Sequence, residues 1–422
     1  MLISFSVKNF KSIKERVTLY MTPASKYHSK SEARSDKIFE TGLSSQDKLL
    51  KSAVVYGANA SGKTSILEAV VVFYKMFTFK KRNRGDIIKY FNPFIFDKKS
   101  IQDSLEFEID FIVDKKRYVY SFGFDKEKIC FEKLNFYKEN KKQNIFEIEF
   151  CDNKFKTKFS KDFFEGDVEK TLNILNNTKN NLFLPLNVNE DGNGFLNSIY
   201  DWIKNKIHVA NSHNINSTLA LLKDKEAEYK DDVVRLMKKA DVGIDDFSVR
   251  EENISKVLNS NGSGPVININ QKLQTVFFSH GKNNPLLSID QESNGTQSLF
   301  GLAGLILPVL KNGGVLFFDE LERSLHPDLL MYITNWFYDK NINKQNAQII
   351  FSAHNDILLD KEYDLFDRDQ VWFTSKTKKE QKTELYSLVE LTDVKARGNL
   401  AKQYREFKFG ARPALQEFYF ED

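Results

Sequence analysis

A glycine-rich loop between an apolar strand and a helix constrains this chain more than any other feature. The residues from Gly57 to Thr64 fit the pattern G-x-x-x-x-G-K-[ST] and follow an apolar strand expected at Ala53–Tyr56. Glycines let successive backbone N–H groups turn towards a phosphate chain, and the positive end of a helix starting near Thr64 adds to the attraction. The sequence therefore predicts that a nucleoside triphosphate is bound by Gly57, Asn59, Ala60, Ser61, Gly62, Lys63, Thr64 and Ser65.

A second apolar strand, Val315–Phe318, ends in the two carboxylates Asp319 and Glu320. An Asp-Glu pair after such a strand is common in purely structural settings, and it gains meaning from the phosphate-binding loop upstream. Asp319, together with the Thr64 hydroxyl, is then expected to hold Mg²⁺, and Glu320 to take a proton from the water that attacks the γ-phosphate. The two segments together predict hydrolysis of a nucleoside triphosphate.

Composition narrows the class of protein. The chain has 422 residues, of which 41% are hydrophobic and 28% charged, as in ordinary proteins with a large core. The net charge of +4 is too small to indicate nucleic-acid binding, and the basic runs 80–84 and 376–379 are typical of solvated loops. Cys130 and Cys151 form no metal-binding spacing. Without a signal-peptide pattern or an apolar run of about 18 residues, we expect a cytoplasmic protein.

The N-terminal part reads as strands around one helix. Leu2–Asn9 and Val17–Met21 alternate like half-buried strands, whereas the polar stretch Thr22–Lys48 is expected to be a long loop. The helix from Thr64 should continue towards Phe77. Four more alternating segments predict an antiparallel meander: Leu105–Val113, Arg117–Phe124, Ile129–Tyr137 and Ile145–Phe150. We expect residues 1–150 to form one ATPase lobe.

The remainder falls into two further parts. Residues 151–285 are expected to be a mainly helical insertion that contacts partners, with helices at Gly166–Leu182, Phe195–Lys206 and Ser217–Ala240 and strands at Asp246–Glu252 and Val266–Ser279. Residues 286–422 alternate helices (Leu299–Leu310, Asp328–Tyr338) with strands (Val315–Phe318, Gln348–Ser352, Gln370–Thr374), which predicts a second lobe with a mainly parallel sheet. The expected fold class is α/β.

Two short motifs flank the carboxylate strand. Glu292–Gln297 precedes the Leu299 helix and, taken alone, would be an ordinary helix N-cap. His354 follows an apolar strand and, taken alone, would be a packed core histidine. Their order around Asp319 and Glu320 resembles that in ABC-type ATPases, and this resemblance implies an anion-binding signature motif and a histidine that senses the γ-phosphate.

The ordered motifs resemble those of ABC-type ATPase heads of the SMC/RecF class. More narrowly, the chain resembles the RecF-like AAA ATPases of bacterial defence systems, such as the ATPase subunits of AbiL-type and PARIS-type abortive-infection modules. This resemblance is carried by Val7–Ile13, Gly57–Ala69, Ala240–Ile244, Glu292–Gln297, Asp319-Glu320, Leu325–Pro327, Ser352–Asn355 and the tail from Tyr404 to Pro413. Phe409 and Arg412 depart from the family tail, and Gln102 is a weak match for its Q-loop glutamine.

The resemblance implies an ABC-type head in which ATP lies between two copies of the chain. The signature residues Ser293, Asn294 and Gly295 of one copy would then face the γ-phosphate bound by the other, with Glu320 and His354 catalytic and Thr64 and Asp319 on Mg²⁺. It also implies a homodimer or larger homo-oligomer, a separate effector such as a nuclease, a phage-encoded trigger, no membrane, and no fused Toprim nuclease before Asp422.

Two alternatives stay open from the sequence. A RecF-like DNA-repair ATPase would clamp DNA between its lobes, although the net charge gives this little support. A P-loop kinase or GTPase is disfavoured by the signature and switch motifs and by the lack of a suitably placed N-K-x-D.

Overall fold

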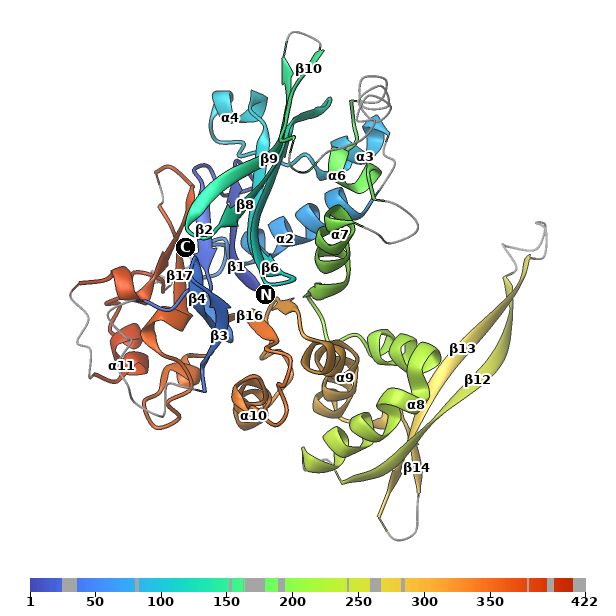
Figure 1. The fold of residues 1–422 in the computed structure, drawn as a ribbon. Helices are drawn as coiled ribbons and strands as arrows, with labels where there is room; N and C mark the ends of the chain where they lie inside the picture. Colours follow the sequence, from blue (N-terminus) through green and yellow to red (C-terminus); the bar gives the residue numbers. More distant parts are fainter. Residues whose placement is uncertain are drawn as a thin grey trace, which may run out of the picture. The chain divides into compact units, whose positions relative to one another are not determined.

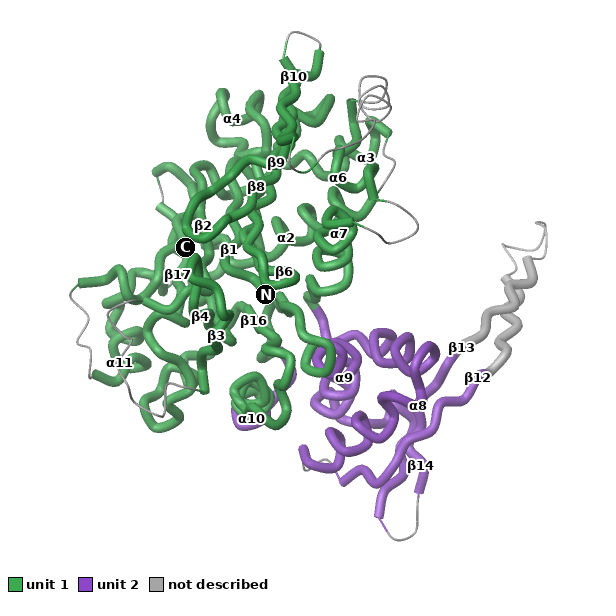
Figure 2. Tube along the Cα trace, in the orientation of Figure 1, with its two compact units in different colours: residues 1–211, 309–322, 330–422 green, residues 212–308, 323–329 purple. Residues whose placement is uncertain are grey.

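The computed structural model divides the chain into two compact units, coloured separately in Figure 2. It describes residues 1–24, 36–79, 83–151, 154–161, 163, 179–188, 194–240, 243–258, 267–281, 285–377, 379–392 and 398–412, with side chains omitted for 252–273. The first unit comprises residues 1–211, 309–322 and 330–422, and the second comprises 212–308 and 323–329.

One sheet of the first unit is antiparallel throughout and is the meander that the alternating segments predict (Figure 1). The N-terminal strand β1 pairs with the meander strand β6 on one side and with β2 on the other. The order of its seven strands is β10 (Lys154–Phe159), β9 (Lys141–Cys151), β8 (Ile129–Lys138), β7 (Lys116–Phe124), β6 (Leu105–Val113), β1 (Leu2–Lys8) and β2 (Val17–Tyr20).

The other large sheet of the first unit is parallel except for its edge strand β18, as the alternation in the C-terminal third predicts. Every residue of β5, β15 and β16 is buried, because parallel strands carry cover on both faces. The carboxyl ends of parallel strands meet at one edge, which sets the place of the site. The order is β11 (Ile207–Ala210), β15 (Val315–Phe318), β16 (Gln348–Ala353), β5 (Ser52–Gly57), β17 (Val371–Lys376) and β18 (Thr383–Ser387).

Helix α2 (Lys63–Thr78) joins the cores of these two sheets. The Phe73 ring lies 5.5 Å from the ring of Phe122 on β7 and 5.7 Å from that of Phe5 on β1, and Phe5 in turn lies 6.4 Å from Phe317 on β15. Aromatic residues thus fill the space between the sheets. The other helices are α3 (Arg84–Tyr90), α4 (Lys98–Gln102), α6 (Phe183–Leu186), α7 (Phe195–Lys206), α10 (Pro327–Tyr338) and α11 (Leu400–Arg405), with short 3-10 turns η3 (Asp356–Leu359), η4 (Arg368–Gln370) and η5 (Leu388–Glu390).

The second unit packs helices against a three-stranded antiparallel sheet. Helix α9 approaches α8 closely because two of its glycines lack side chains. A Cβ on Gly301 would lie 2.6 Å from the His213 carbonyl oxygen, and one on Gly304 would lie 2.4 Å from the Thr218 nitrogen. The elements are α8 (Ile215–Lys239), β12 (Ile244–Leu258), β13 (Ile267–His280), β14 (Leu286–Ser288), η2 (Ile289–Gln291) and α9 (Asn294–Asn312).

Some expectations need correction. The loop expected over Thr22–Lys48 is wrong in part, since Ile38–Leu43 (β3) and Gln46–Leu50 (β4) form a hairpin that buries Phe39 and Leu49. The stretch 151–285 also contains strands β10 and β11, which the sequence did not predict. Most of the helix expected at Gly166–Leu182 lies outside the described residues, whereas those at Phe195–Lys206 and Ser217–Ala240 are confirmed.

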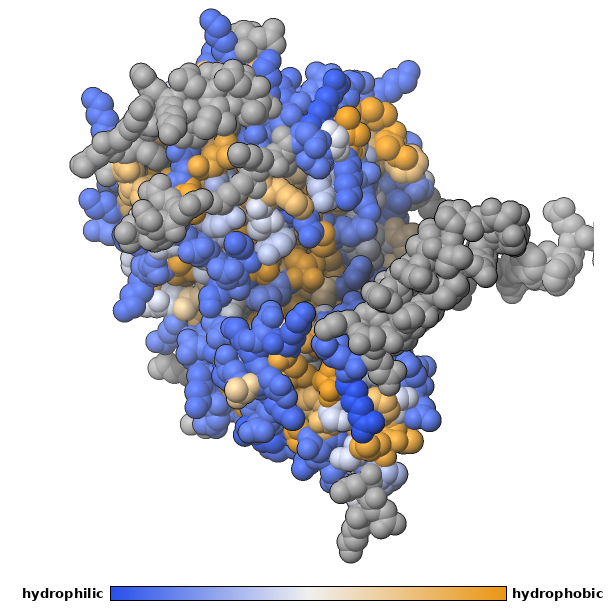
Figure 3. Space-filling model, turned by 90° about the vertical axis from the view of Figure 1, so that its right-hand side faces the viewer, coloured by the Kyte–Doolittle hydropathy of each residue, from blue (hydrophilic) through white to orange (hydrophobic). Residues whose placement is uncertain are grey.

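On the face drawn in Figure 3, hydrophilic residues predominate and hydrophobic ones gather in separate patches. Across the described ranges, no helix is both long enough and apolar enough to cross a membrane.

Gln348 is the polar residue on which the junction of the two large sheets depends. Its buried amide accepts from Leu2 N–H at 2.6 Å and donates to the Leu2 and Leu50 carbonyls at 3.0 Å each. We expect Gln348→Ala to lower the free energy of unfolding by about 3 kcal/mol, because buried backbone groups lose their partners.

Urea denaturation measures this loss. As a control, Gln46→Ala removes only a hydrogen bond to the Lys48 carbonyl two residues away and should cost less than about 1 kcal/mol. Equal losses for the two variants would contradict the role given to Gln348.

Candidate nucleotide site

The loop between β5 and α2 is curled and tightly packed against its own sheet. Ala60 and Gly62 have φ of 62° and 115°, the left-handed conformations that turn the backbone inward. A Cβ on Gly57 would lie 2.2 Å from Thr374 Oγ1, and one on Gly62 would lie 2.2 Å from Thr383 Oγ1. Packing therefore requires glycine at both positions of the motif, and at Gly62 the left-handed backbone favours it as well.

Hydroxyl groups from distant segments hold the loop in place. Ser61 Oγ lies 2.6 Å from Thr374 Oγ1 on β17, and Thr383 on β18 donates to the Ser61 carbonyl at 2.8 Å. Ser12, in the turn after β1, lies 3.1 Å from Ser65 through the two hydroxyl oxygens. The sequence did not predict these supports, because they come from segments far away in the chain.

The Lys63 ammonium group is buried in the concave side of the loop. It donates to the Gly57 carbonyl at 2.6 Å and to the Ala58 carbonyl at 3.3 Å. Burial lowers the pKa of Lys63, and the nearby carboxylates of Asp319 and Glu320 partly offset this shift. A cation held by two neutral carbonyls lies ready for a stronger anionic partner.

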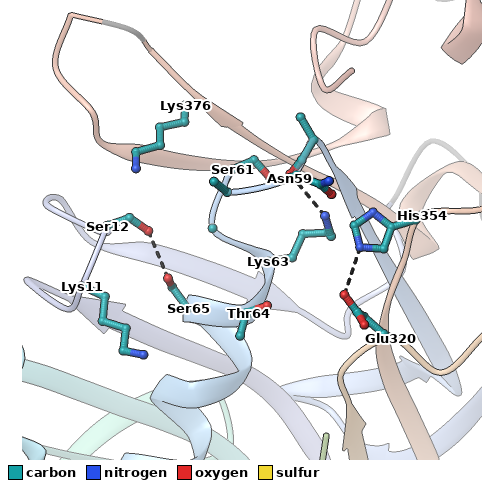
Figure 4. Close-up of a pocket in the computed structure, with 13 residues that line it drawn as sticks. Lys11, Ser12, Asn59, Ser61, Lys63, Thr64, Ser65, Glu320, His354 and Lys376 are labelled. Carbon is teal, nitrogen blue, oxygen red and sulfur yellow. Dashed lines mark hydrogen bonds and ion pairs between the residues drawn. The ribbon is translucent and has the colours of Figure 1, made fainter. Parts of the chain in front are cut away.

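Lys63 lies in a cavity of roughly 500 Å³, shown in Figure 4. Nine of the predicted site residues line it: Asn59, Ala60, Ser61, Gly62, Lys63, Thr64, Ser65, Glu320 and His354. Ala58, Lys11, Ser12 and Lys376 complete the lining. None of these four residues was among the predicted site residues. Lys11 and Ser12 lie in the Val7–Ile13 segment and Lys376 begins a basic run, but neither feature indicates that these residues meet at the phosphate-binding loop.

The carboxylates after β15 are positioned by the neighbouring strand β16. Ser352 Oγ donates to Asp319 Oδ1 at 2.5 Å and accepts from the Glu320 N–H at 2.8 Å. Glu320 has a φ of 55°, a left-handed conformation that a glutamate adopts only at a cost of about 1–3 kcal/mol. With this backbone conformation the Glu320 side chain lines the cavity.

His354, at the end of β16, lies opposite Glu320 in Figure 4. Its Nε2 is 3.3 Å from Glu320 Oε1, and its backbone N–H donates to Glu322. The residues predicted to be catalytic therefore meet at one end of the cavity. Lys11 and Lys376 lie on the other side of the phosphate-binding loop.

Glu322 is a functional candidate that the sequence did not single out. Burial raises the pKa of its carboxyl group, although the hydrogen bond from the His354 backbone acts in the opposite direction. Its second oxygen, Oε2, is buried and has no hydrogen-bond partner within the described part of the chain. Glu322 thus fixes the backbone of His354.

The predicted signature residues belong to the second unit, whereas the cavity belongs to the first. Ser293 caps helix α9, since its hydroxyl oxygen accepts from Thr296 N–H at 3.1 Å. Ser293 and Asn294 are exposed, and Glu292 before them is anchored 2.7 Å from His280 Nε2. Gln102, the weak Q-loop match, is exposed at the end of α4 and does not line the cavity.

The residues present suit Mg²⁺ bound with a nucleotide. Thr64 supplies a hydroxyl and Asp319 a carboxylate, both hard oxygen ligands. Within the described residues, no group of three or more His, Cys, Asp or Glu side chains could hold a metal ion. A magnesium ion here would therefore need phosphate oxygens to complete its coordination, as is usual for this ion in nucleotide sites.

Comparison with known proteins finds one matching family model and several similar structures. The family model described as "AAA domain, putative AbiEii toxin, Type IV TA system" matches residues 52–360. No curated protein matches the chain. Among solved structures, the chain is similar to an Smc head bound to the C-terminal winged-helix domain of ScpA (14% identity, 92% of this chain and 97% of that one, TM-score 0.41). It is also similar to a Pyrococcus furiosus Smc head with an extended coiled coil (13% identity, 96% and 98%, TM-score 0.40).

Glu322→Gln tests the buried carboxyl group through pH. Because the folded pKa is raised above the unfolded value, ionised Glu322 lowers stability, and this cost is absent below the unfolded pKa and grows as pH rises. Glutamine keeps an oxygen for the His354 N–H. We therefore expect the variant to match the wild type in melting temperature near pH 4.5 and to exceed it at pH 8.

The control is Glu362→Gln, an exposed glutamate outside this network. Its difference from the wild type should not change with pH. A Glu322→Gln variant that becomes less stable than the wild type as pH rises would show that the charged form of Glu322 stabilises the fold.

Proposed function

The chain belongs to this family of AAA domains, and on that premise we propose that it binds and hydrolyses ATP as an ABC-type ATPase. The observation that carries the proposal is a single cavity in which the phosphate-binding loop faces Glu320 and His354. This cavity combines the Lys63 cation, the backbone of the phosphate-binding loop and the Glu320 carboxylate, which lies 3.3 Å from His354.

Each residue has a definite task in hydrolysis. Lys63 leaves the Gly57 and Ala58 carbonyls and neutralises the β- and γ-phosphate oxygens. Glu320 takes a proton from the attacking water, whose oxygen forms a bond to the γ-phosphorus while the bond to the bridging oxygen of ADP breaks. His354, 3.3 Å from Glu320, orients this carboxylate and contacts the γ-phosphate. Mg²⁺, when bound at Thr64 and Asp319, would neutralise the charge that develops on the β- and γ-oxygens.

Gly295 supports the expectation that a second copy completes the site. A Cβ on Gly295 would lie 3.5 Å from the Ser324 carbonyl oxygen and 3.7 Å from Ser293 Oγ, which are ordinary contact distances. Its own chain therefore does not require a glycine, although glycine in a helix costs about 1 kcal/mol relative to alanine. The glycine is explained if the phosphates bound by another copy of the chain approach this position closely.

We assign the ATPase to a bacterial anti-phage system, as a sensor or scaffold whose ATP-bound state holds a separate effector, such as a nuclease, until a phage-encoded trigger acts. Support comes from the family description, which names a toxin of a toxin–antitoxin system. A RecF-like repair ATPase would differ in a measurable way, because DNA would stimulate its hydrolysis and the effect would fall steeply with salt.

Two variants separate binding from hydrolysis. Glu320→Gln should bind ATP with the wild-type Kd but hydrolyse it about 10²- to 10⁴-fold more slowly, because the general base is lost. Lys63→Ala should weaken ATP binding about 10- to 100-fold, because charge-assisted contacts to the phosphates are lost. Calorimetric titration and phosphate release measure the two effects.

Matched controls lie in the same unit of the structure. Lys75→Ala removes an exposed lysine from α2, and Glu384→Gln neutralises an exposed carboxylate on β18. Neither should change binding or rate. Wild-type hydrolysis by Glu320→Gln would refute the assignment of the base.

Gly295→Glu tests the contribution of a second copy. A carboxylate in the first turn suits the dipole of helix α9, so folding should be preserved, but it would repel the γ-phosphate of the other copy. In a Glu320→Gln background with ATP and Mg²⁺, mass photometry should detect an assembly that Gly295→Glu abolishes while ATP still binds.

The control for this experiment is Asn216→Glu, which places a carboxylate in the exposed first turn of α8 in the same unit. It should leave assembly intact. Unchanged assembly and hydrolysis in Gly295→Glu would contradict a signature role for this residue.

A further inference from the structure

The cavity has two ends with different chemistry, and this fixes the direction of a bound triphosphate. Glu320 and His354 mark the end at which the terminal phosphate is cleaved. Lys11, Ser12 and Lys376 lie on the other side of the loop in Figure 4. A nucleotide whose γ-phosphate faces Glu320 must therefore direct its sugar and base towards Lys11 and Ser12.

A second hollow of roughly 470 Å³ begins at that end. It shares Lys11 and Ser12 with the phosphate cavity, and its other walls are mostly apolar: Phe91, Pro93, Ile95 and Phe96, next to Asn92. Ile95 and Phe96 are 66% and 59% exposed, the highest values among the large apolar side chains described. Apolar side chains exposed beside a binding cavity commonly mark a surface that a bound ligand covers.

The segment that carries these side chains is held firmly. The Lys11 N–H donates to the Asn92 carbonyl at 2.8 Å, and the Phe94 N–H donates to Asn9 Oδ1 at 3.1 Å. The Asn9 amide is buried and donates in turn to the Ser100 carbonyl at 2.7 Å. Phe94 is buried beneath the segment, so Phe96 is presented to solvent by an anchored backbone.

The Phe96 ring has contacts that suit stacking. Its centroid lies 5.6 Å from that of Phe94, and Lys376 Nζ lies 5.9 Å from it. Lys376 also lines the phosphate cavity, so one cation borders both the phosphate end and the apolar hollow. A cationic cavity next to an apolar hollow matches a nucleotide, whose anionic phosphate chain is followed by a flat aromatic base.

We propose that the segment Phe91–Phe96 is the base-binding part of the nucleotide site, with the base stacked against Phe96 and covering Ile95. The proposal rests on the proposed function, since it assumes a triphosphate in the loop. Aromatic stacking of a base is typically strong enough to change affinity about 5- to 100-fold when the ring is removed.

The test compares ATP with inorganic tripolyphosphate, which has the phosphates without the base. Each ligand is titrated into the full chain in the presence of Mg²⁺, and its affinity is measured by calorimetry. The Phe96→Ala variant should bind ATP about tenfold more weakly than the wild type and should bind tripolyphosphate with the wild-type affinity. Phe96→Trp should retain ATP affinity. The control, Phe79→Ala, removes an exposed ring that does not line either hollow and should change neither affinity.

The outcomes separate this inference from the proposed function. Unchanged ATP affinity in both Phe96→Ala and Ile95→Ala would overturn the base site, as would an equal loss for ATP and tripolyphosphate. If Arg412→Ala weakened the binding of ATP but not of tripolyphosphate, the base would lie instead in the hollow beside Thr374, Lys376 and Arg412, and the inference would be overturned. A wild-type chain that binds neither ligand would overturn the proposed function as well.

Discussion

The close packing of the phosphate-binding loop against strands β17 and β18 is the constraint on which the site depends. No side chain fits at Gly57 or Gly62, because Thr374 and Thr383 occupy the space where a Cβ would lie. The same two threonines hold Ser61 by hydrogen bonds. The curl that turns backbone N–H groups towards a phosphate chain is therefore fixed before any ligand binds, which reduces the entropy lost on binding.

The parallel sheet brings the remaining groups to this loop. Because β5, β15 and β16 are neighbours and run in the same direction, the residues that follow each of them meet at one edge. Ser352 on β16 holds the Asp319 carboxylate and the Glu320 backbone N–H, and Glu322 holds the backbone of His354. Few of these contacts are strong alone, but each restricts a side chain that must be placed accurately for proton transfer.

Local patterns predicted much of this, and long-range contacts account for what was missed. The loop motif, the buried strands and the alternating meander follow from short segments, and the structure confirms those elements. The hairpin at Ile38–Leu50 was missed because its buried residues are few and lie among polar ones. Ser12, Lys376 and Glu322 could not be assigned from sequence, since their roles arise only where distant segments meet.

A structure of the full chain carrying Glu320→Gln, determined with ATP and Mg²⁺, tests the central claim most directly. The account predicts a triphosphate along the loop from Asn59 to Ser65, with Lys63 on its β- and γ-phosphates and its terminal phosphate towards residue 320 and His354. A nucleotide bound elsewhere, or a loop that remains without nucleotide at saturating ATP while Lys63 still contacts the Gly57 carbonyl, would contradict it.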